Sequence, residues 1–145
     1  MSSISVTSRQ AGRRADVAAP CIVVRRIYER DPPSTGRRVL VDRLWPRGVS
    51  KTEAALDEWA KDVAPSDELR RWYGHDPQLF DKFARRYRRE LRHSPCADIV
   101  ANLLEIARQD GITLLTATRD VEHSGARVLQ RHMLADLERM KKKPS

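Results

Sequence analysis

The feature that most constrains this fold is the run Ile-Thr-Leu-Leu-Thr-Ala at residues 112–117. It is nearly continuously apolar instead of alternating, and it follows a helix-like segment that Gly111 closes. A strand of this kind must be covered on both faces, which is the situation of a central strand between layers of an α/β sheet. The chain is therefore predicted to fold around residues 112–117.

Two earlier segments predict further strands. Residues 21–28 are rich in β-branched side chains, and residues 38–44 form a second apolar run after a turn-rich break at residues 31–36. A long helical stretch separates the strand at Val39 from the strand at Ile112. Strands joined by such a crossover are expected to be parallel.

Helix signals fill the remaining chain. Ser50 and Glu53 form a capping box, which opens a helix expected to carry Ala55, Leu56 and Trp59 on one face. Ser66 is expected to cap a short helix ending near Gly74, Asp76-Pro77 starts a third, Ser94-Pro95 a fourth, and Ser124 the last. These elements predict an α/β fold: a single three-layer domain with a small mixed, partly parallel sheet flanked by about five helices.

The third helix has the clearest pattern. Its apolar residues fall at i, i+3, i+4, i+7 and i+11, a single stripe, while six cations lie off that stripe. The stripe is Phe80, Phe83, Ala84, Tyr87 and Leu91, and the cations are Lys82, Arg85, Arg86, Arg88, Arg89 and Arg92. The basic face of residues 82–92 is either simply solvated or a footprint for a nucleic-acid backbone.

The 145 residues suit one domain at 21–140, with a disordered basic tail at 1–20 and a basic tail at 141–145. No apolar run approaches the roughly 20 residues that span a bilayer, and the first residues have no apolar core of a secretory signal. A cytoplasmic protein without membrane association is expected. Cys21 and Cys96 lack metal-ligand spacing, so neither a metal site nor another cofactor is predicted.

A two-loop pocket is the predicted binding site. Parallel strands end at one edge of a sheet, where open α/β sheets bind ligands, so residues 42–48 are expected to face residues 116–125. The net charge of +8 favours an anionic small molecule there. The second loop leads into a helix N-terminus, which attracts anions. The predicted ligand-binding residues are Arg43, Trp45, Arg47, Thr118, Arg119, Asp120 and Arg127.

Three residues are candidates for acid–base catalysis: Asp42, His75 and His123. Each also has a structural interpretation. Asp42 with Arg43 or Arg119 can be an ion pair that ties a loop to the sheet, and the histidines can bond to backbone. No phosphate-binding glycine loop, GxGxxG, HExxH or GxSxG motif accompanies them.

From residue 22 to about residue 134 the chain resembles the YeaO-like family, a bacterial domain of unknown function numbered 488. The resemblance rests on motifs spread along the chain: Val41-Asp42-Arg43-Leu44-Trp45-Pro46-Arg47-Gly48, Trp59-Ala60-Lys61, Ala64-Pro65-Ser66, Leu69-Arg70, Gly74-His75-Asp76, Phe83 with Arg86-Tyr87, and Leu114-Leu115 with Asp120 and Glu122-His123. The resemblance implies a small cytoplasmic α/β protein without an assigned activity or cofactor.

One departure from the family pattern bears on function. The YeaO-like pattern usually has Asn-His where this chain has Ser124-Gly125, which shifts the expectation from catalysis toward binding. The leading prediction is a pocket for an anion or a phosphate-containing small molecule. An enzyme, a hydrolase or transferase acting on a phosphorylated or nucleotide-like substrate, and a weak nucleic-acid-binding accessory protein are the alternatives. The sequence leaves the oligomeric state open.

Overall fold

The computed structural model describes residues 22–29 and 36–142. The expected N-terminal tail, most of the turn-rich break and residues 143–145 lie outside these ranges. The C-terminal helix α5 (Gly125–Lys142) extends to residue 142, so the first two residues of the expected C-terminal tail are helical. None of the helices in the described part is both long enough and apolar enough to cross a bilayer.

Four strands form one sheet in the order β2 (Ile22–Arg26), β5 (Ile112–Thr116), β3 (Arg37–Leu40) and β4 (Glu58–Trp59). β5 is central and fully buried, as its apolar run predicts, and it pairs in parallel with β3 on one side and β2 on the other. The α/β class is confirmed. The described strands do not form the mixed sheet that was expected, since every described pairing is parallel. Helices connect β3 to β4 and β4 to β5, and each crossover brings the chain back so that the next strand runs in the same direction.

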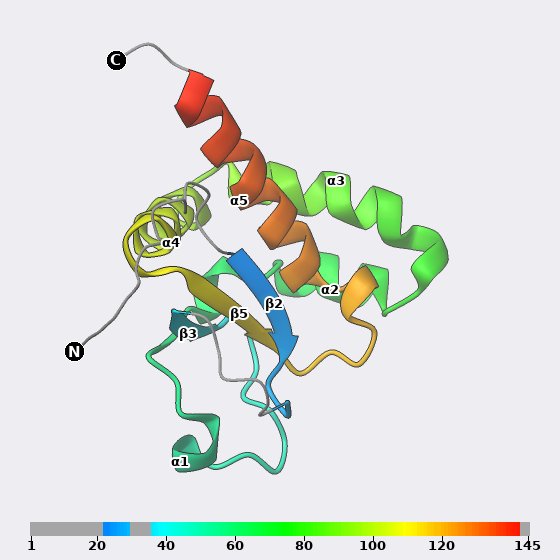
Figure 1. The fold of residues 1–145 in the computed structure, drawn as a ribbon. Helices are drawn as coiled ribbons and strands as arrows, with labels where there is room; N and C mark the ends of the chain where they lie inside the picture. Colours follow the sequence, from blue (N-terminus) through cyan, green and yellow to red (C-terminus); the bar gives the residue numbers. More distant parts are fainter. Residues whose placement is uncertain (1–21, 30–35, 143–145) are drawn as a thin grey trace, which may run out of the picture.

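The two faces of the sheet are covered unequally (Figure 1). Helices α3 (Phe80–Leu91), α4 (Cys96–Asp110) and α5 lie on one side, where Val39 and Leu114 enter the main core. The alternate residues, such as Leu115, point to the other side, where the described chain covers them with the short helix α1 (Lys51–Ala54) and the loops beside it. The three layers are therefore one thick helical layer, the sheet and one thin layer.

Helix α3 buries the stripe that its sequence predicts. Phe83, Ala84, Tyr87 and Leu91 are buried, and Phe80 is half-buried at the helix start. The Tyr87 hydroxyl satisfies its hydrogen-bonding need by donating to the carbonyl of Val63 at 2.7 Å. The capping predictions hold as well, since the Ser50 box, the Ser66 cap and the Asp76-Pro77 start are all present.

The helix expected to carry Trp59 was predicted wrongly. α1 ends at Ala54, and Ala55 adopts a left-handed conformation with φ of 49°. The chain then returns to the sheet, where the N–H of Asp57 donates to the Arg38 carbonyl at 2.9 Å and Trp59 becomes part of the edge strand β4. The spacing of apolar residues after Ser50 matched a helix, but backbone pairing with β3 stabilises the strand instead.

Strand β3 is also shorter than expected. Its ladder extends one residue beyond Leu40, where the Val41 N–H donates to the Leu115 carbonyl at 3.0 Å. Residues 42–48 are then a loop, in which side-chain hydrogen bonds hold Asp42, Arg43 and Trp45. Trp45, for example, donates its indole N–H to the carbonyl of Val49 at 2.6 Å.

Candidate functional site

A cavity of about 620 Å³ opens at the edge of the sheet where the parallel strands end. We call it the loop cleft. Residues that follow three strands line it: Tyr28 after β2, residues 41–47 after β3 and residues 117–120 after β5. The start of α5 and part of the chain around α2 (Asp67–Tyr73) complete the wall. The two loops that the sequence expected to face each other therefore meet here.

Asp42 joins the two loops. One of its carboxylate oxygens accepts a hydrogen bond from the Thr116 hydroxyl and the other from the N–H of Ala117, both at 2.8 Å. Its backbone carbonyl accepts the indole N–H of Trp59, also at 2.8 Å. Asp42 makes no ion pair with Arg43 or Arg119 in the described structure; its partners are neutral groups at the end of β5.

The protonation of Asp42 reflects this burial. Loss of solvent raises the pKa of the carboxyl above its ordinary 3.8, while the hydrogen bonds from Ala117 and Thr116 and the charge of His75 act in the opposite direction. The neighbouring phenol of Tyr73 is affected in the same way: burial, followed by the charges of Asp120 and Asp76, raises its pKa to about 12. Hydrogen bonds hold both groups in place, since the Tyr73 hydroxyl donates to the His123 carbonyl at 2.6 Å.

Arg43 lines the cleft but points its guanidinium away toward the chain before α2. Its terminal nitrogen donates to the carbonyls of Ala64 and Pro65 at 3.3 and 3.4 Å. Asp62 and Asp67 lie 3.7 and 3.8 Å from other guanidinium nitrogens. Since these acceptors already bind the guanidinium, Arg43 holds the wall of the cleft in place and has less of its charge available for a ligand.

Arg47 and Arg119 are the exposed cations of the cleft. Both line it, and neither side chain forms an ion pair or hydrogen bond with any residue that the structure describes. Arg70 is a third lining cation, but it pairs with Asp67 at 3.3 Å. The apolar part of the wall includes Trp45, which packs edge-on against Trp59 with ring centroids 5.3 Å apart.

The first turn of α5 contributes backbone groups to the same cleft. Ser124, Gly125 and Ala126 line it, and the Ser124 hydroxyl accepts the N–H of Arg127 at 3.2 Å as the helix cap. Within the described ranges no acceptor bonds the N–H groups of Gly125 or Ala126. The N-terminus of an 18-residue helix thus directs free N–H groups and the positive end of its dipole toward the cleft.

Of the remaining predicted site residues, some line the cleft and others lie outside it. His75, with φ of 58°, lines the cleft, as do Thr118 and Asp120. His123 does not line the cleft: its ring nitrogen Nδ1 lies 2.8 Å from an Asp120 oxygen, and its ring packs edge-on against Phe80.

Arg127 also lies outside the lining. Its guanidinium donates to Glu122 at 2.8 Å and to Gln130 at 2.7 Å. Arg127 therefore braces the start of α5 within the helix and its preceding turn. Among the described residues of this turn, Ser124, Gly125 and Ala126 line the cleft instead.

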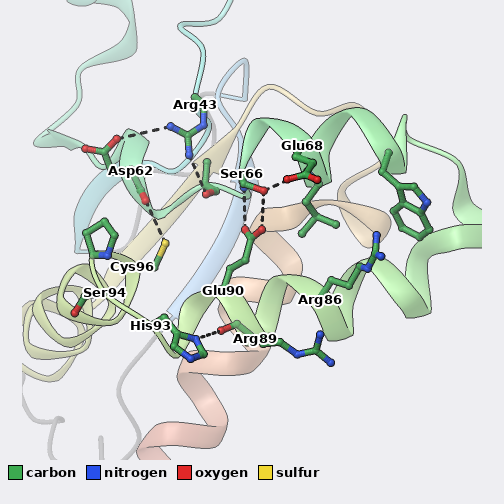
Figure 2. Close-up of a pocket in the computed structure, with 14 residues that line it drawn as sticks. Arg43, Asp62, Ser66, Glu68, Arg86, Arg89, Glu90, His93, Ser94 and Cys96 are labelled. Atoms are coloured by element: carbon green, nitrogen blue, oxygen red, sulfur yellow. Dashed lines mark hydrogen bonds and ion pairs between the residues drawn. The ribbon is translucent and has the colours of Figure 1, made fainter.

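A second hollow, of about 950 Å³, lies between α2, the end of α3 and the start of α4 (Figure 2). Glu90 crosses it to accept hydrogen bonds from the Ser66 N–H and hydroxyl at 2.8 and 2.6 Å. Cys96 at its far end donates to the Asp62 carbonyl, and burial raises the pKa of its thiol. The sequence identified Ser66 as a helix cap, but no signal indicated that Glu90 would approach it.

No group of three or more His, Cys, Asp or Glu side chains within residues 22–29 and 36–142 is arranged to hold a metal ion. The loop cleft instead combines guanidinium groups, free N–H groups and aromatic surface. Such a combination can bind an anion and pack against an attached apolar or ring group.

Comparison with known proteins identifies the family. The model of the inactive DUF488-N3 subclade matches residues 21–145, so this small parallel α/β protein belongs to the YeaO-like DUF488 family. The chain is similar to an uncharacterised protein of Mycobacterium tuberculosis strain H37Rv, 48% identical over 106 residues, which cover 73% of this chain and 87% of that protein. A Mycobacterium bovis protein, also uncharacterised, matches to the same extent.

The Escherichia coli K12 protein YeaO, likewise uncharacterised, is 38% identical over 108 residues, covering 74% of this chain and 92% of YeaO. No solved structure matches the chain significantly.

Proposed function

We propose that this protein binds a small anionic molecule, bearing a phosphate or carboxylate group, in the loop cleft and does not transform it. One observation carries the proposal. Two exposed arginines, Arg47 and Arg119, and the N–H groups at the start of α5 line one cleft with an aromatic wall, and none of these groups has a partner within residues 22–29 and 36–142. Each of these groups attracts negative charge.

The charges of the lining favour an anion. Four arginines line the cleft, at positions 43, 47, 70 and 119, against two aspartates, Asp42 and Asp120. Asp42 is turned to the end of β5 and Asp120 contacts His123. The backbone N–H groups of Gly125 and Ala126 are further donors, and no side chain of the described protein accepts a hydrogen bond from them.

Binding without chemistry fits the candidate catalytic residues. Both oxygens of Asp42 already accept hydrogen bonds, and His123 lies outside the lining. A general base must reach the proton that it removes, and the carboxylate oxygens of Asp42 bond to the end of β5 instead. The description of the matched subclade as inactive supports the same conclusion. Cys96 is a free thiol, which agrees with a reducing cytoplasm as the proposed compartment.

Ligand-induced thermal stabilisation tests the proposal. Inorganic phosphate, pyrophosphate and a nucleoside monophosphate are each titrated against the full chain at constant ionic strength, set with sodium chloride. A ligand at about 100 times its Kd stabilises the native state by about 2.7 kcal/mol. Arg119→Ala is expected to remove the stabilisation.

Arg71→Ala provides the matched control, because Arg71 is exposed on α2, without a described partner, and outside the cleft. Arg43→Ala is a poorer probe, since it also releases the carbonyls of residues 64 and 65. If none of the three anions stabilises the protein, or if Arg71→Ala removes the effect as fully as Arg119→Ala, the cleft is not the anion site.

A further inference from the structure

The outer face of α3 is a row of cations without acidic partners. Its exposed members are Lys82, Arg85, Arg86, Arg89 and Arg92. None of them forms an ion pair with an acid in the described part of the chain. The helix has two acids, Asp81 and Glu90, and Glu90 is turned inward to Ser66. This face therefore keeps positive charge that an anionic partner can complement.

The spacing of these cations suits a polyanion. On one helix face, side chains three or four residues apart lie about 5–6 Å from one another. Lys82, Arg85 or Arg86, Arg89 and Arg92 follow this spacing along α3. A chain of phosphates can therefore contact several of them in succession, whereas a single small anion meets one or two.

An exposed aromatic ring lies beside the row. Trp72 on α2 is 38% exposed, and the Arg86 guanidinium carbon lies 4.7 Å from its ring centroid. Both line the second hollow, where Figure 2 labels Arg86. The aromatic residues of α3 itself are engaged in packing: Phe83 and Tyr87 are buried, and the half-buried Phe80 contacts the rings of Phe83 and His123. Trp72 supplies the stacking surface that α3 lacks.

We infer that α3 and Trp72 bind single-stranded nucleic acid, with phosphates along the arginines and an unpaired base on Trp72 or on the Arg86 guanidinium. Stacking on an aromatic ring beside a basic track is how proteins hold single strands without reading sequence. A duplex keeps its bases inside, so it gains only the phosphate contacts. This surface is separate from the loop cleft, and the inference does not depend on anion binding there.

The test measures fluorescence anisotropy of labelled single strands of about 12 nucleotides, a length that fits common single-strand site sizes. RNA and DNA strands of the same sequence and a DNA duplex are compared over a series of salt concentrations. With about four phosphate contacts, log K is expected to fall with log salt at a slope of about −3 for single strands. Neutralising Arg85, Arg86 and Arg89 together to Gln removes two of these four contacts and is expected to reduce the magnitude of that slope by about 1.4.

A control triple variant, with Lys51, Arg108 and Lys141 changed to Gln, removes the same charge from exposed positions outside α3. It is expected to bind nearly as the wild type does. Trp72→Ala is expected to weaken single-strand binding about tenfold, and Trp72→Phe, which keeps a ring, much less. Circular dichroism and thermal melting confirm that each variant is folded.

Tryptophan fluorescence adds a direct readout. Stacking of a base is expected to quench Trp72, and the quenching is expected to vanish in Trp72→Phe while Trp45 and Trp59 remain. The inference is overturned if no strand binds at low salt, if the two triple variants lose binding equally, or if Trp72→Ala binds single strands as tightly as the wild type. Equal preference for the duplex would also contradict it.

Discussion

Removal of the Asp42 carboxylate tests what holds the loop cleft together. In Asp42→Ala, the Thr116 hydroxyl and the Ala117 N–H each lose an acceptor at 2.8 Å. A hydrogen bond to a charged group contributes about 1.5–3 kcal/mol, so the two bonds together amount to about 3–6 kcal/mol. The burial that raises the pKa of Asp42 offsets part of this sum, and we expect a net loss of about 2–3 kcal/mol.

The assay is urea unfolding followed by circular dichroism, with thermal melting as a second readout. For a chain of this size, about 1 kcal/mol corresponds to roughly 4 °C, so the melting temperature is expected to fall by roughly 8–12 °C. Asp110→Ala provides the control, because Asp110 is exposed and its ion pair with Arg37 spans 3.6 Å. An exposed pair of this kind contributes about 0–1 kcal/mol. The reasoning is refuted if Asp42→Ala and Asp110→Ala destabilise the protein equally.

Three further predictions follow from individual contacts. Because the pKa of Asp42 is raised above 3.8, the folded state holds the proton of this carboxyl more tightly than the unfolded state does, so the group stabilises the fold at low pH and loses that effect as pH rises through the raised pKa. The stability of Asp42→Asn relative to wild type should therefore increase from pH 4 to pH 7. A stability difference in urea unfolding that stays constant over this pH range would contradict this prediction. At Gly36, with φ of 65°, an added Cβ would lie 2.1 Å from the carbonyl oxygen of Gly111, so Gly36→Ala should destabilise the protein by more than about 3 kcal/mol. Gly48 has a similar φ of 73° but open space around it, so Gly48→Ala should cost only about 1 kcal/mol. Equal losses of stability in thermal melting would refute the packing argument. Tyr87→Phe should lose about 1–2 kcal/mol, since a buried carbonyl then lacks its donor at 2.7 Å, and unfolding at the wild-type urea midpoint would contradict that.

The sequence predicted the parts of the fold that periodicity and capping specify. The continuous apolar run became the buried central strand, and the five-residue stripe of α3 faces the core. The long helical crossover predicted the parallel pairing of β3 with β5, and that pairing brings residues 42–47 to residues 117–120. The location of the loop cleft could therefore be predicted from topology alone.

What the sequence missed depends on contacts between distant residues. Trp59 has helical spacing after Ser50, but it lies in β4, because pairing with β3 and the bond to the Asp42 carbonyl favour the extended chain. His132 on α5 is buried, and burial lowers the pKa of its imidazole. Arg43 lines the cleft, but it also donates to the carbonyls before α2, which no local pattern indicated. Local patterns contain no information on such long-range partners.

The most direct test of the central proposal is an NMR titration of the full chain with inorganic phosphate, following backbone amide resonances at constant ionic strength. Saturable shifts are expected to be largest at Gly125, Ala126 and Arg119, where N–H groups and a guanidinium without partners in the described part of the chain line the cleft. The shifts should be lost in Arg119→Ala and retained in Arg71→Ala. Shifts confined to α3, or absent from the start of α5 at saturation, would contradict anion binding in the loop cleft.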